Sequence, residues 1–218
     1  MNLGFLGGTG IEAKGLALRF AAAGASAILG SRLAERAQQA AVACNAILGR
    51  PLIRGLGNPD MLQACDVIFF TIPFAQAAQA ADSCRCRLNR HHVIVDVTVP
   101  MVFHGGHPEY VEQEGGSNSE IIASHLPEGV PLVAAFKTIP AFILAEIGTV
   151  LNCDLLVCSD AEAAKRTVME VASLIPSLRP LDGGPLRAAR TLERMAALAV
   201  GLNRRYKSKG ARFRVEGI

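Results

Sequence analysis

Four small residues near the N-terminus have the spacing of a phosphate-binding turn. Gly8, Gly10 and Ala13 fit the pattern GxGxxG/A, with Thr9 between the two glycines. The first glycine allows a tight turn, the second lets the backbone approach a pyrophosphate, and the small third residue lets a helix pack on the preceding strand. Amides at the helix start, from Ile11, would face the phosphates. The pattern predicts a dinucleotide site over residues 8–11, although glycine-rich turns also serve as ordinary strand-to-helix connections.

The end of the next predicted strand indicates which dinucleotide binds. An NAD site places Asp or Glu there, about twenty residues beyond the glycines, whereas this chain has Ser31 and Arg32. A guanidinium pairs bidentately with a 2'-phosphate that a carboxylate would repel. Arg36 lies one helical turn beyond Arg32 and on the same face. We therefore predict NADP rather than NAD as the cofactor; a solvated basic helix start is the alternative interpretation.

Three later segments share an ending of threonine, an apolar residue and proline, at residues 71–73, 98–100 and 138–140. Proline cannot continue a strand, so each strand stops just beyond its carboxyl end. Ligands bind at that edge of an open parallel sheet. We expect threonine hydroxyls and free carbonyls to form a wall facing the nicotinamide, unless the three endings are unrelated. The cofactor contacts predicted on this edge are Thr71, Ile72, Pro73, Val97 and Ala135.

These residues require a sheet in which strands and helices alternate. Apolar runs predict strands at 3–6, 25–29, 53–56, 67–72, 93–97, 132–136 and 155–158. Helices are expected from residue 11 to Gly24 and at 33–48, 61–64, 75–83, 161–174 and 186–203, with residues 57–59 breaking the chain. The alternation predicts an α/β fold with a doubly wound, mostly parallel sheet, a Rossmann fold. We expect an NADP-binding domain over 1–140 and a small C-terminal α/β lobe over 141–218, continuous with the same sheet.

Composition narrows the class of protein. The chain has 218 residues, half of them hydrophobic, which is enough for a core that needs no metal or disulfide. The sequence begins with a strand rather than a leader, and no uninterrupted apolar run reaches the roughly 18 residues of a membrane span. We expect a soluble cytoplasmic protein. Six cysteines then read as free thiols, with those at 44, 65, 153 and 158 in the core.

Two groups of residues could suggest a metal site. Cys84 and Cys86 precede two histidines at 91 and 92, but a zinc knuckle has two residues between its cysteines rather than one. His104 and His107 with Glu109 lie in a glycine-rich stretch that does not preorganise ligands. We predict no metal, and a substrate-facing or solvated histidine pair.

Residues 101–131 look irregular, with a short helix from Ser117, and such a long loop is typical of a lid or a substrate loop.

The C-terminal end is basic, although the net charge is only +3. Nine Lys or Arg but two acidic residues lie between Arg187 and Ile218. Without a nucleic-acid motif or interleaved aromatic residues, we expect an anionic small ligand or a solvated tail rather than nucleic acid. The final predicted helix places Leu192, Met195, Ala199 and Leu202 on one face, which indicates core packing first and a homodimer contact second.

Six short blocks together resemble one family, the NADPH-dependent reductases of the deazaflavin coenzyme F420. They are LGGTG at 6–10, GSR at 30–32, VDVTVP at 95–100, AAF at 134–136, DGGPLR at 182–187 and LNRRY at 202–206. The resemblance, which runs nearly end to end, implies a dinucleotide fold with a small C-terminal part. It also implies that Thr9, Ser31, Arg32 and Arg36 hold NADP. Lys137 departs from the amide side chain that such sequences often have, and the loop 104–110 is particular to this chain.

The resemblance implies reversible hydride transfer from C4 of the nicotinamide to C5 of the deazaflavin. Because both ring systems supply their own electronics, the protein has to hold them in contact and exclude water, and no catalytic triad or carboxylate pair is expected. One alternative is another acceptor for NADPH: a flavin, a ferric complex, or a small carbonyl or imine. Another is an NADP-sensing binding protein without turnover. The acceptor, the direction and the assembly state stay open at this point.

Overall fold

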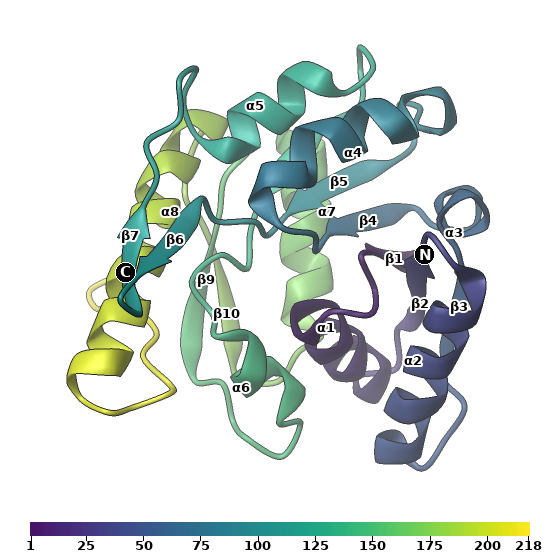
Figure 1. The fold of residues 1–218 in the computed structure, drawn as a ribbon, viewed down its shortest axis with the longest axis horizontal. Coiled ribbons are helices and arrows are strands. Elements are labelled where there is room, and N and C mark those ends of the chain that lie inside the picture. Colours follow the sequence, from purple (N-terminus) through teal and green to yellow (C-terminus); the bar gives the residue numbers. More distant parts are fainter.

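A six-stranded parallel sheet forms the centre of the computed structural model, which describes all 218 residues (Figure 1). The strand order is β3-β2-β1-β4-β5-β8, the order of a doubly wound dinucleotide-binding fold. The strands are β1 (Asn2–Leu6), β2 (Ser26–Ser31), β3 (Ile53–Gly57), β4 (Val67–Phe70), β5 (Val93–Asp96) and β8 (Leu132–Ala134). The predicted fold class is therefore confirmed.

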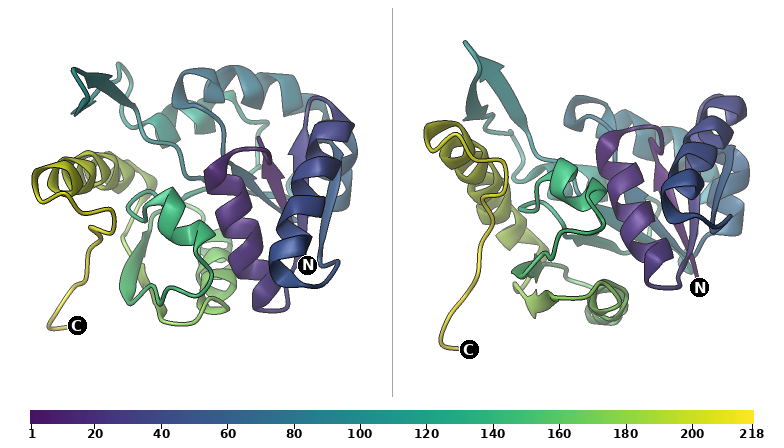
Figure 2. Two further views of the ribbon diagram at one scale, coloured as in Figure 1. Left: turned by 60° about the horizontal axis from the view of Figure 1, so that its bottom comes forward. Right: turned by 90° about the horizontal axis from the view of Figure 1, so that it is seen from below.

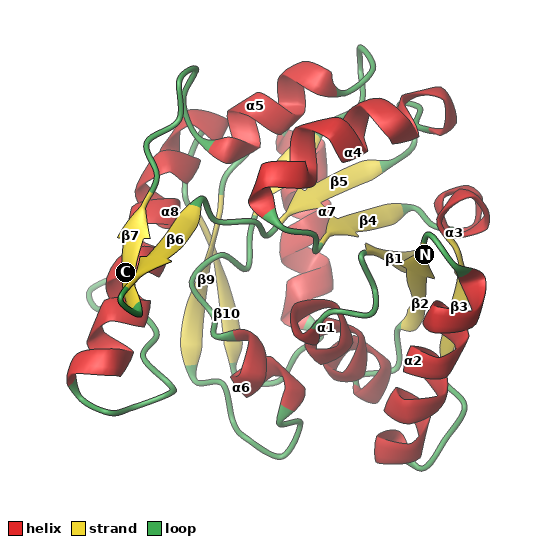
Figure 3. Cartoon of the chain, viewed as in Figure 1, coloured by secondary structure: helices red, strands yellow, loops and turns green.

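Helices cover both faces of this sheet (Figures 2 and 3). Buried residues of α1 (Ile11–Ala22), α2 (Ala34–Leu48), α6 (Ala141–Ala145) and α7 (Glu162–Ser173) pack on one face. Those of α3 (Asn58–Ala64), α4 (Ala77–Cys84), α5 (Asn118–His125) and α8 (Ala189–Arg205) pack on the other. Short 3-10 turns lie at Phe74–Gln76, Arg85–Arg87 and Leu186–Ala188. Coverage on both sides explains why β4 is apolar throughout.

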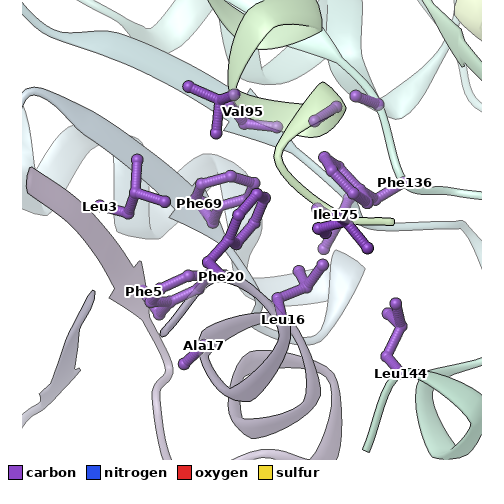
Figure 4. Packing of buried hydrophobic residues seen from close by; sticks show 14 of the residues in the cluster. Leu3, Phe5, Leu16, Ala17, Phe20, Phe69, Val95, Phe136, Leu144 and Ile175 are labelled. Atoms are coloured by element: carbon purple, nitrogen blue, oxygen red, sulfur yellow. The ribbon is translucent and has the colours of Figure 1, made fainter. Parts of the chain in front are cut away.

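Four phenylalanines join the sheet to the helices above it (Figure 4). Phe5 of β1 stacks on Phe69 of β4 with ring centroids 4.9 Å apart. Phe136 then meets Phe69 and Phe20 edge-on, at 5.8 and 6.0 Å. Phe136 has a φ of +59°, which is costly for a bulky side chain. The aromatic packing therefore holds the backbone after β8 in a strained conformation beside the site described below.

The C-terminal part has its own two-stranded parallel sheet, β9 (Cys153–Val157) with β10 (Leu178–Asp182). An isolated antiparallel bridge between Ala134 and Cys158 joins it to β8. Strand β10 was not expected, and Pro180 at its centre is unusual for a strand. This strand pairs with β9 alone, so proline is tolerated there. One hydrophobic cluster runs from Leu3 to Leu178, and the domain boundary at residue 140 stays a prediction.

Residues 101–110 were expected to be irregular, and that expectation is wrong. They form a hairpin of β6 (Met101–His104) and β7 (His107–Tyr110). Gly105 and Gly106 make its turn with φ angles of +55° and +83°, as a two-residue hairpin loop requires. The predicted helix after Ser117 is confirmed as α5, with a capping box between Ser117 and Glu120.

The expected chain break at residues 57–59 is also wrong. Asn58 and Pro59 form the first turn of α3, where proline lacks only an amide that has no helical partner in any case. The final helix agrees with its predicted core role, because Leu192 and Ala199 are buried. All six cysteines are free thiols, and those at 44, 65, 153 and 158 are buried as predicted. None of the helices is long and apolar enough to cross a lipid bilayer.

Arg19 connects α1 to the segment around α6. Its buried guanidinium donates hydrogen bonds to the carbonyls of Ile143, Leu144, Glu146 and Thr149 at 2.6–3.0 Å. The last carbonyls of a helix have no partner within it. A side chain from α1 therefore completes the C-terminal end of α6.

Candidate functional site

A cleft of about 850 Å³ opens at the carboxyl edge of the sheet, above β1, β2 and β4. The turn after β1 forms its floor: Gly7 has a φ of +86°, and the Gly10 amide donates to the Gly7 carbonyl at 3.0 Å. Eight of the predicted cofactor contacts line this cleft, namely Thr9, Gly10, Ser31, Arg32, Arg36, Thr71, Ile72 and Pro73. Residues from three separate strand ends are thus brought together in one hollow.

Gly8 lies behind the cleft rather than in its lining. Its amide donates to the Gly30 carbonyl at 2.8 Å, and a Cβ at Gly8 would lie 2.7 Å from the Cβ of Leu29. The first glycine of the motif therefore allows the turn to pack against β2. Ile11 is mostly exposed, and it lies outside the lining of the cleft.

One end of the cleft is basic. Arg32 and Arg36 are exposed, and neither guanidinium forms an ion pair within the protein. The Ser31 hydroxyl accepts a hydrogen bond from the Leu33 amide at 3.3 Å, and its own proton is free to be donated. Two unpaired guanidinium groups and a hydroxyl make a suitable site for a phosphate monoester.

Asn58 is a cleft residue that the sequence analysis missed. Its Oδ1 atom is buried without a hydrogen-bond partner, and the residue lines the cleft at the end of β3. A buried amide oxygen without a partner is costly. Asn58 can therefore accept a hydrogen bond from a bound ligand. Its position directly after a predicted strand was the available signal, but Gly57, Asn58 and Pro59 were interpreted as a chain break.

The three threonines do not form the expected wall. Thr71 lines the cleft, but its hydroxyl donates to the Leu6 carbonyl at 2.7 Å. Thr98 is buried and donates to the Asp96 carboxylate at 2.6 Å, whereas Thr138 lines a different cavity. The shared sequence ending predicts where the strands stop, but tertiary packing assigns each hydroxyl a different surrounding.

A second, mostly apolar cavity of about 250 Å³ lies on the other side of the start of α1. Its walls come from α1, the segment after β5, the segment between β8 and α6, and α8. Val97, Phe136 and Ile139 contribute to this lining. Gly10 lines the cleft and Glu12 lines the cavity, so the two hollows adjoin at the first turn of α1. Ala135 is fully buried and lies outside both linings.

Beneath this cavity lies a buried charge cluster of Lys137, Asp96 and Glu193. The Lys137 ammonium is 2.7 Å from Asp96 and 3.3 Å from Glu193, and all three side chains are inaccessible to solvent. Burial raises the pKa of Glu193, while the ammonium acts in the opposite direction. Because the side chain of Lys137 is fully buried, only its main chain faces the cavity. Lys137 therefore stabilises the cavity wall, and its charge is not offered to a ligand.

Glu12 is the second residue that the sequence analysis missed. Its Oε1 atom is buried without a hydrogen-bond partner, and burial raises its pKa to about 8. The residue follows the phosphate-binding glycines within the GxGxxA pattern. A carboxyl group this close to the phosphate-binding glycines was the available signal in the sequence.

The hairpin histidines lie apart from both hollows. His104 is 3.6 Å from Glu109, and both side chains are exposed. No group of three or more His, Cys, Asp or Glu side chains in the structure has the arrangement of a metal site.

The strand order and the glycine-turn cleft define a Rossmann-type dinucleotide-binding protein. Residues 2–100 match the family model described as NADP oxidoreductase, coenzyme F420-dependent. Over the whole chain, the protein is 36% identical to the F420-dependent NADP reductase of Methanothermobacter thermautotrophicus, covering 96% of that protein. It is 32% identical to the reductase of the same name from Methanocaldococcus jannaschii, covering 99% of it. The chain belongs to the F420-dependent NADP reductase family.

Solved structures agree on the fold. A crystal structure of a candidate F420-dependent NADP-reductase from Arthrobacter sp. FB24 superimposes with a TM-score of 0.81. The match covers both chains completely at 21% sequence identity, so this likeness shows a shared fold over all 218 residues.

Proposed function

We propose that this protein transfers a hydride directly between NADP(H) and the deazaflavin coenzyme F420. The observation that carries the proposal is the pair of adjoining hollows: a cleft with an unpaired basic end beside a smaller apolar cavity. A dinucleotide lying in the cleft has its nicotinamide end beside the apolar cavity, where a flat acceptor ring can stack against it. The names of the family relatives support the same pair of reactants.

Each part of the cleft has a proposed role. The turn from Gly8 to Ile11 surrounds the pyrophosphate, and the backbone amides of Thr9 and Ile11 contact it, because amides face a ligand at the start of a helix. The amides of Gly8 and Gly10 instead hold the turn in shape through the Gly30 and Gly7 carbonyls. Ser31, Arg32 and Arg36 hold the 2'-phosphate, and residues 71–73 contact the nicotinamide half. Val97 borders the acceptor ring, and Ala135 supports this wall from behind.

The hydride step itself requires little of the protein beyond positioning. Hydride moves from C4 of the nicotinamide to C5 of the deazaflavin, and both ring systems supply their own electronics. Apolar walls at Val97, Phe136 and Ile139 exclude water and hold the two rings in contact, which lowers the entropic part of the barrier.

The basic end of α8 supports an anionic acceptor. Asn203 lines the apolar cavity, and the next residues, including Arg204, Arg205 and Lys207, are exposed. These charges can attract an acidic tail on the acceptor. Salt should then raise the KM for the acceptor, because ions screen exposed charges. Kinetics that do not depend on salt would remove this part of the proposal.

The decisive experiment mixes purified protein, NADPH and oxidised coenzyme F420, and follows the loss of the visible absorbance of the deazaflavin. Free flavin and ferric citrate are assayed in parallel. Rapid bleaching of the deazaflavin alone is the expected result. Reduction of flavin or ferric iron instead would identify a different acceptor. Tight NADPH binding without any turnover would favour a nucleotide-sensing role.

We also propose a cytoplasmic homodimer. Leu198 on α8 and Phe103 on the hairpin are more than half exposed, and their burial against a second copy would be favourable. Sedimentation at micromolar concentration should give twice the 23.0 kDa mass of the chain. A species of monomer mass would contradict this assembly.

A further inference from the structure

Glu12 lies where the two hollows meet, in the first turn of α1. Two residues earlier, Gly10 lines the cofactor cleft, while Glu12 lines the apolar cavity together with Val97 and Phe136. A carboxyl group in this position is next to both the proposed nicotinamide site and the proposed acceptor site. Neither the glycine turn nor the helix needs an acidic residue there for its own geometry.

Nothing in the protein pairs with this carboxyl group. Its Oε1 atom is buried without a hydrogen-bond partner. The cavity lining from α1, the segment after β5, the segment before α6, and α8 contains one other titratable residue, Lys137. The Lys137 ammonium is held by Asp96 and Glu193, so it does not neutralise Glu12. An unpaired carboxyl in an apolar site lowers stability, and such groups are concentrated at functional sites.

Burial also decides the protonation state. The start of a helix favours a carboxylate, but burial is the larger effect here and raises the pKa of Glu12 to about 8. The group is therefore protonated at neutral pH. It can give up a proton to a bound ligand and regain one from water.

The proposed reaction needs such a group. Reduction of a deazaflavin takes up one hydride at C5 and one proton at the ring nitrogen N1, and NADPH supplies only the hydride. On the basis of the proposed function, we infer that Glu12 is the acid that delivers this second proton to the acceptor ring. As the hydride leaves C4 of the nicotinamide, the O–H bond of Glu12 breaks and an N–H bond forms. The carboxylate is then protonated by solvent, and in the reverse direction it accepts the same proton.

The kinetic test uses Glu12→Gln, which keeps the shape but cannot titrate, and Glu170→Gln, the same change at an exposed carboxylate of α7. Loss of a general acid should lower kcat for deazaflavin reduction by about 10²-fold. The wild-type rate should fall above about pH 8, and Glu12→Gln should lack this step. Since NADPH and coenzyme F420 titrate equally in all assays, a difference between the pH profiles of wild type and Glu12→Gln comes from the protein. A Glu12→Gln rate and pH profile equal to those of Glu170→Gln would overturn the inference.

A second readout needs no turnover. Carbon-13 NMR of carboxyl-labelled protein without ligand should show one resonance, absent from Glu12→Gln, that titrates near pH 8. Its titration at the ordinary pH of a glutamate would overturn the inference. If this resonance behaves as expected and NADPH binds to wild type, yet wild type does not bleach the deazaflavin, the proposed function has failed. In that case Glu12 does not protonate a deazaflavin, although its raised pKa has been measured.

Discussion

Arg32 and Lys137 carry the same charge in opposite surroundings. Arg32 is exposed at the mouth of the cleft without a carboxylate partner, so its guanidinium is free to pair with a ligand. Lys137 has a fully buried side chain between Asp96 and Glu193, so its ammonium group pairs only with these two carboxylates. These surroundings, rather than the residue type, decide that one cation affects binding and the other affects stability.

Replacing Arg32 with alanine should weaken NADPH binding and leave NADH binding nearly unchanged. A charge-assisted contact to the 2'-phosphate contributes about 1.5–3 kcal/mol, and NADH lacks that phosphate. Isothermal titration calorimetry with each nucleotide measures the two affinities, with Arg50→Ala as an exposed control. Equal losses for both nucleotides would show that Arg32 does not bind the 2'-phosphate.

Replacing Lys137 with methionine should lower the free energy of unfolding by about 3–5 kcal/mol, because two buried carboxylates lose their cation. Burial already raises the pKa of Glu193, and Lys137 opposes that rise. Without Lys137 the folded-state pKa rises further above the unfolded value. The variant therefore loses stability as pH rises from the unfolded-state pKa of Glu193 through its folded-state pKa. The difference in free energy of unfolding between variant and wild type should be smaller near about pH 5 than near about pH 8.

Urea unfolding at both pH values measures this effect. Lys209→Met, at an exposed lysine, is the matched control and should be close to wild type. A Lys137→Met protein as stable as Lys209→Met would mean that the buried cluster contributes little to stability.

At the scale of elements, alternation of apolar runs and turn residues predicts most strands and helices of the sheet. The errors occur where a local signal has two meanings. Asn58–Pro59 can break a chain or begin a helix, and the packing of Met61 and Leu62 against the sheet selects the helix. His104-Gly-Gly-His107 can be a loop or a hairpin turn. Here β7 packs along α8, a contact that no local pattern contains.

One close contact between elements can be tested at Gly55 in β3. A Cβ at this position would overlap the backbone of Ala37 in α2, which cannot move aside as a flexible side chain could. Gly55→Ala should lower the free energy of unfolding by about 3 kcal/mol. Gly49→Ala is the control, since its Cβ meets no atom within 4 Å and only its positive φ costs about 1 kcal/mol. Thermal unfolding compares the two, and equal effects would contradict the close packing of α2 on β3.

At the scale of the molecule, the cofactor cleft could be predicted and the apolar cavity could not. The cleft is built from motifs that follow single strands, so each carries its own sequence signal. The cavity combines segments near residues 12, 97–101, 136–141 and 196–203, and no local pattern brings these together. For the same reason Asp96 and Glu193 gave no sign of their burial, whereas the glycines and the Ser31–Arg32 pair could be found.

The two parts of the chain share their core, which has a consequence for stability. Buried residues of α1 pack with Leu144, Leu155 and Val168 in one cluster. A fragment of residues 1–140 would expose that face of α1. We expect the fragment to lack a cooperative thermal transition, whereas the full chain unfolds in one step, as circular dichroism can measure. A fragment that unfolds cooperatively and binds NADPH would instead support an independent N-terminal domain.

Arg19 has a consequence for the newly made protein. Its carbonyl partners lie 124–130 residues further along the chain, and Phe20 beside it packs on Phe136. During synthesis at about 5–20 residues per second, these partners leave the ribosome roughly 6–25 seconds after α1. In that interval the part of α1 that packs on α6 and on Phe136 is uncovered on the nascent chain. The packing of the nucleotide-binding half is therefore completed only after the C-terminal half has been synthesised. Until then, α1 is a target for chaperones that bind exposed apolar helices.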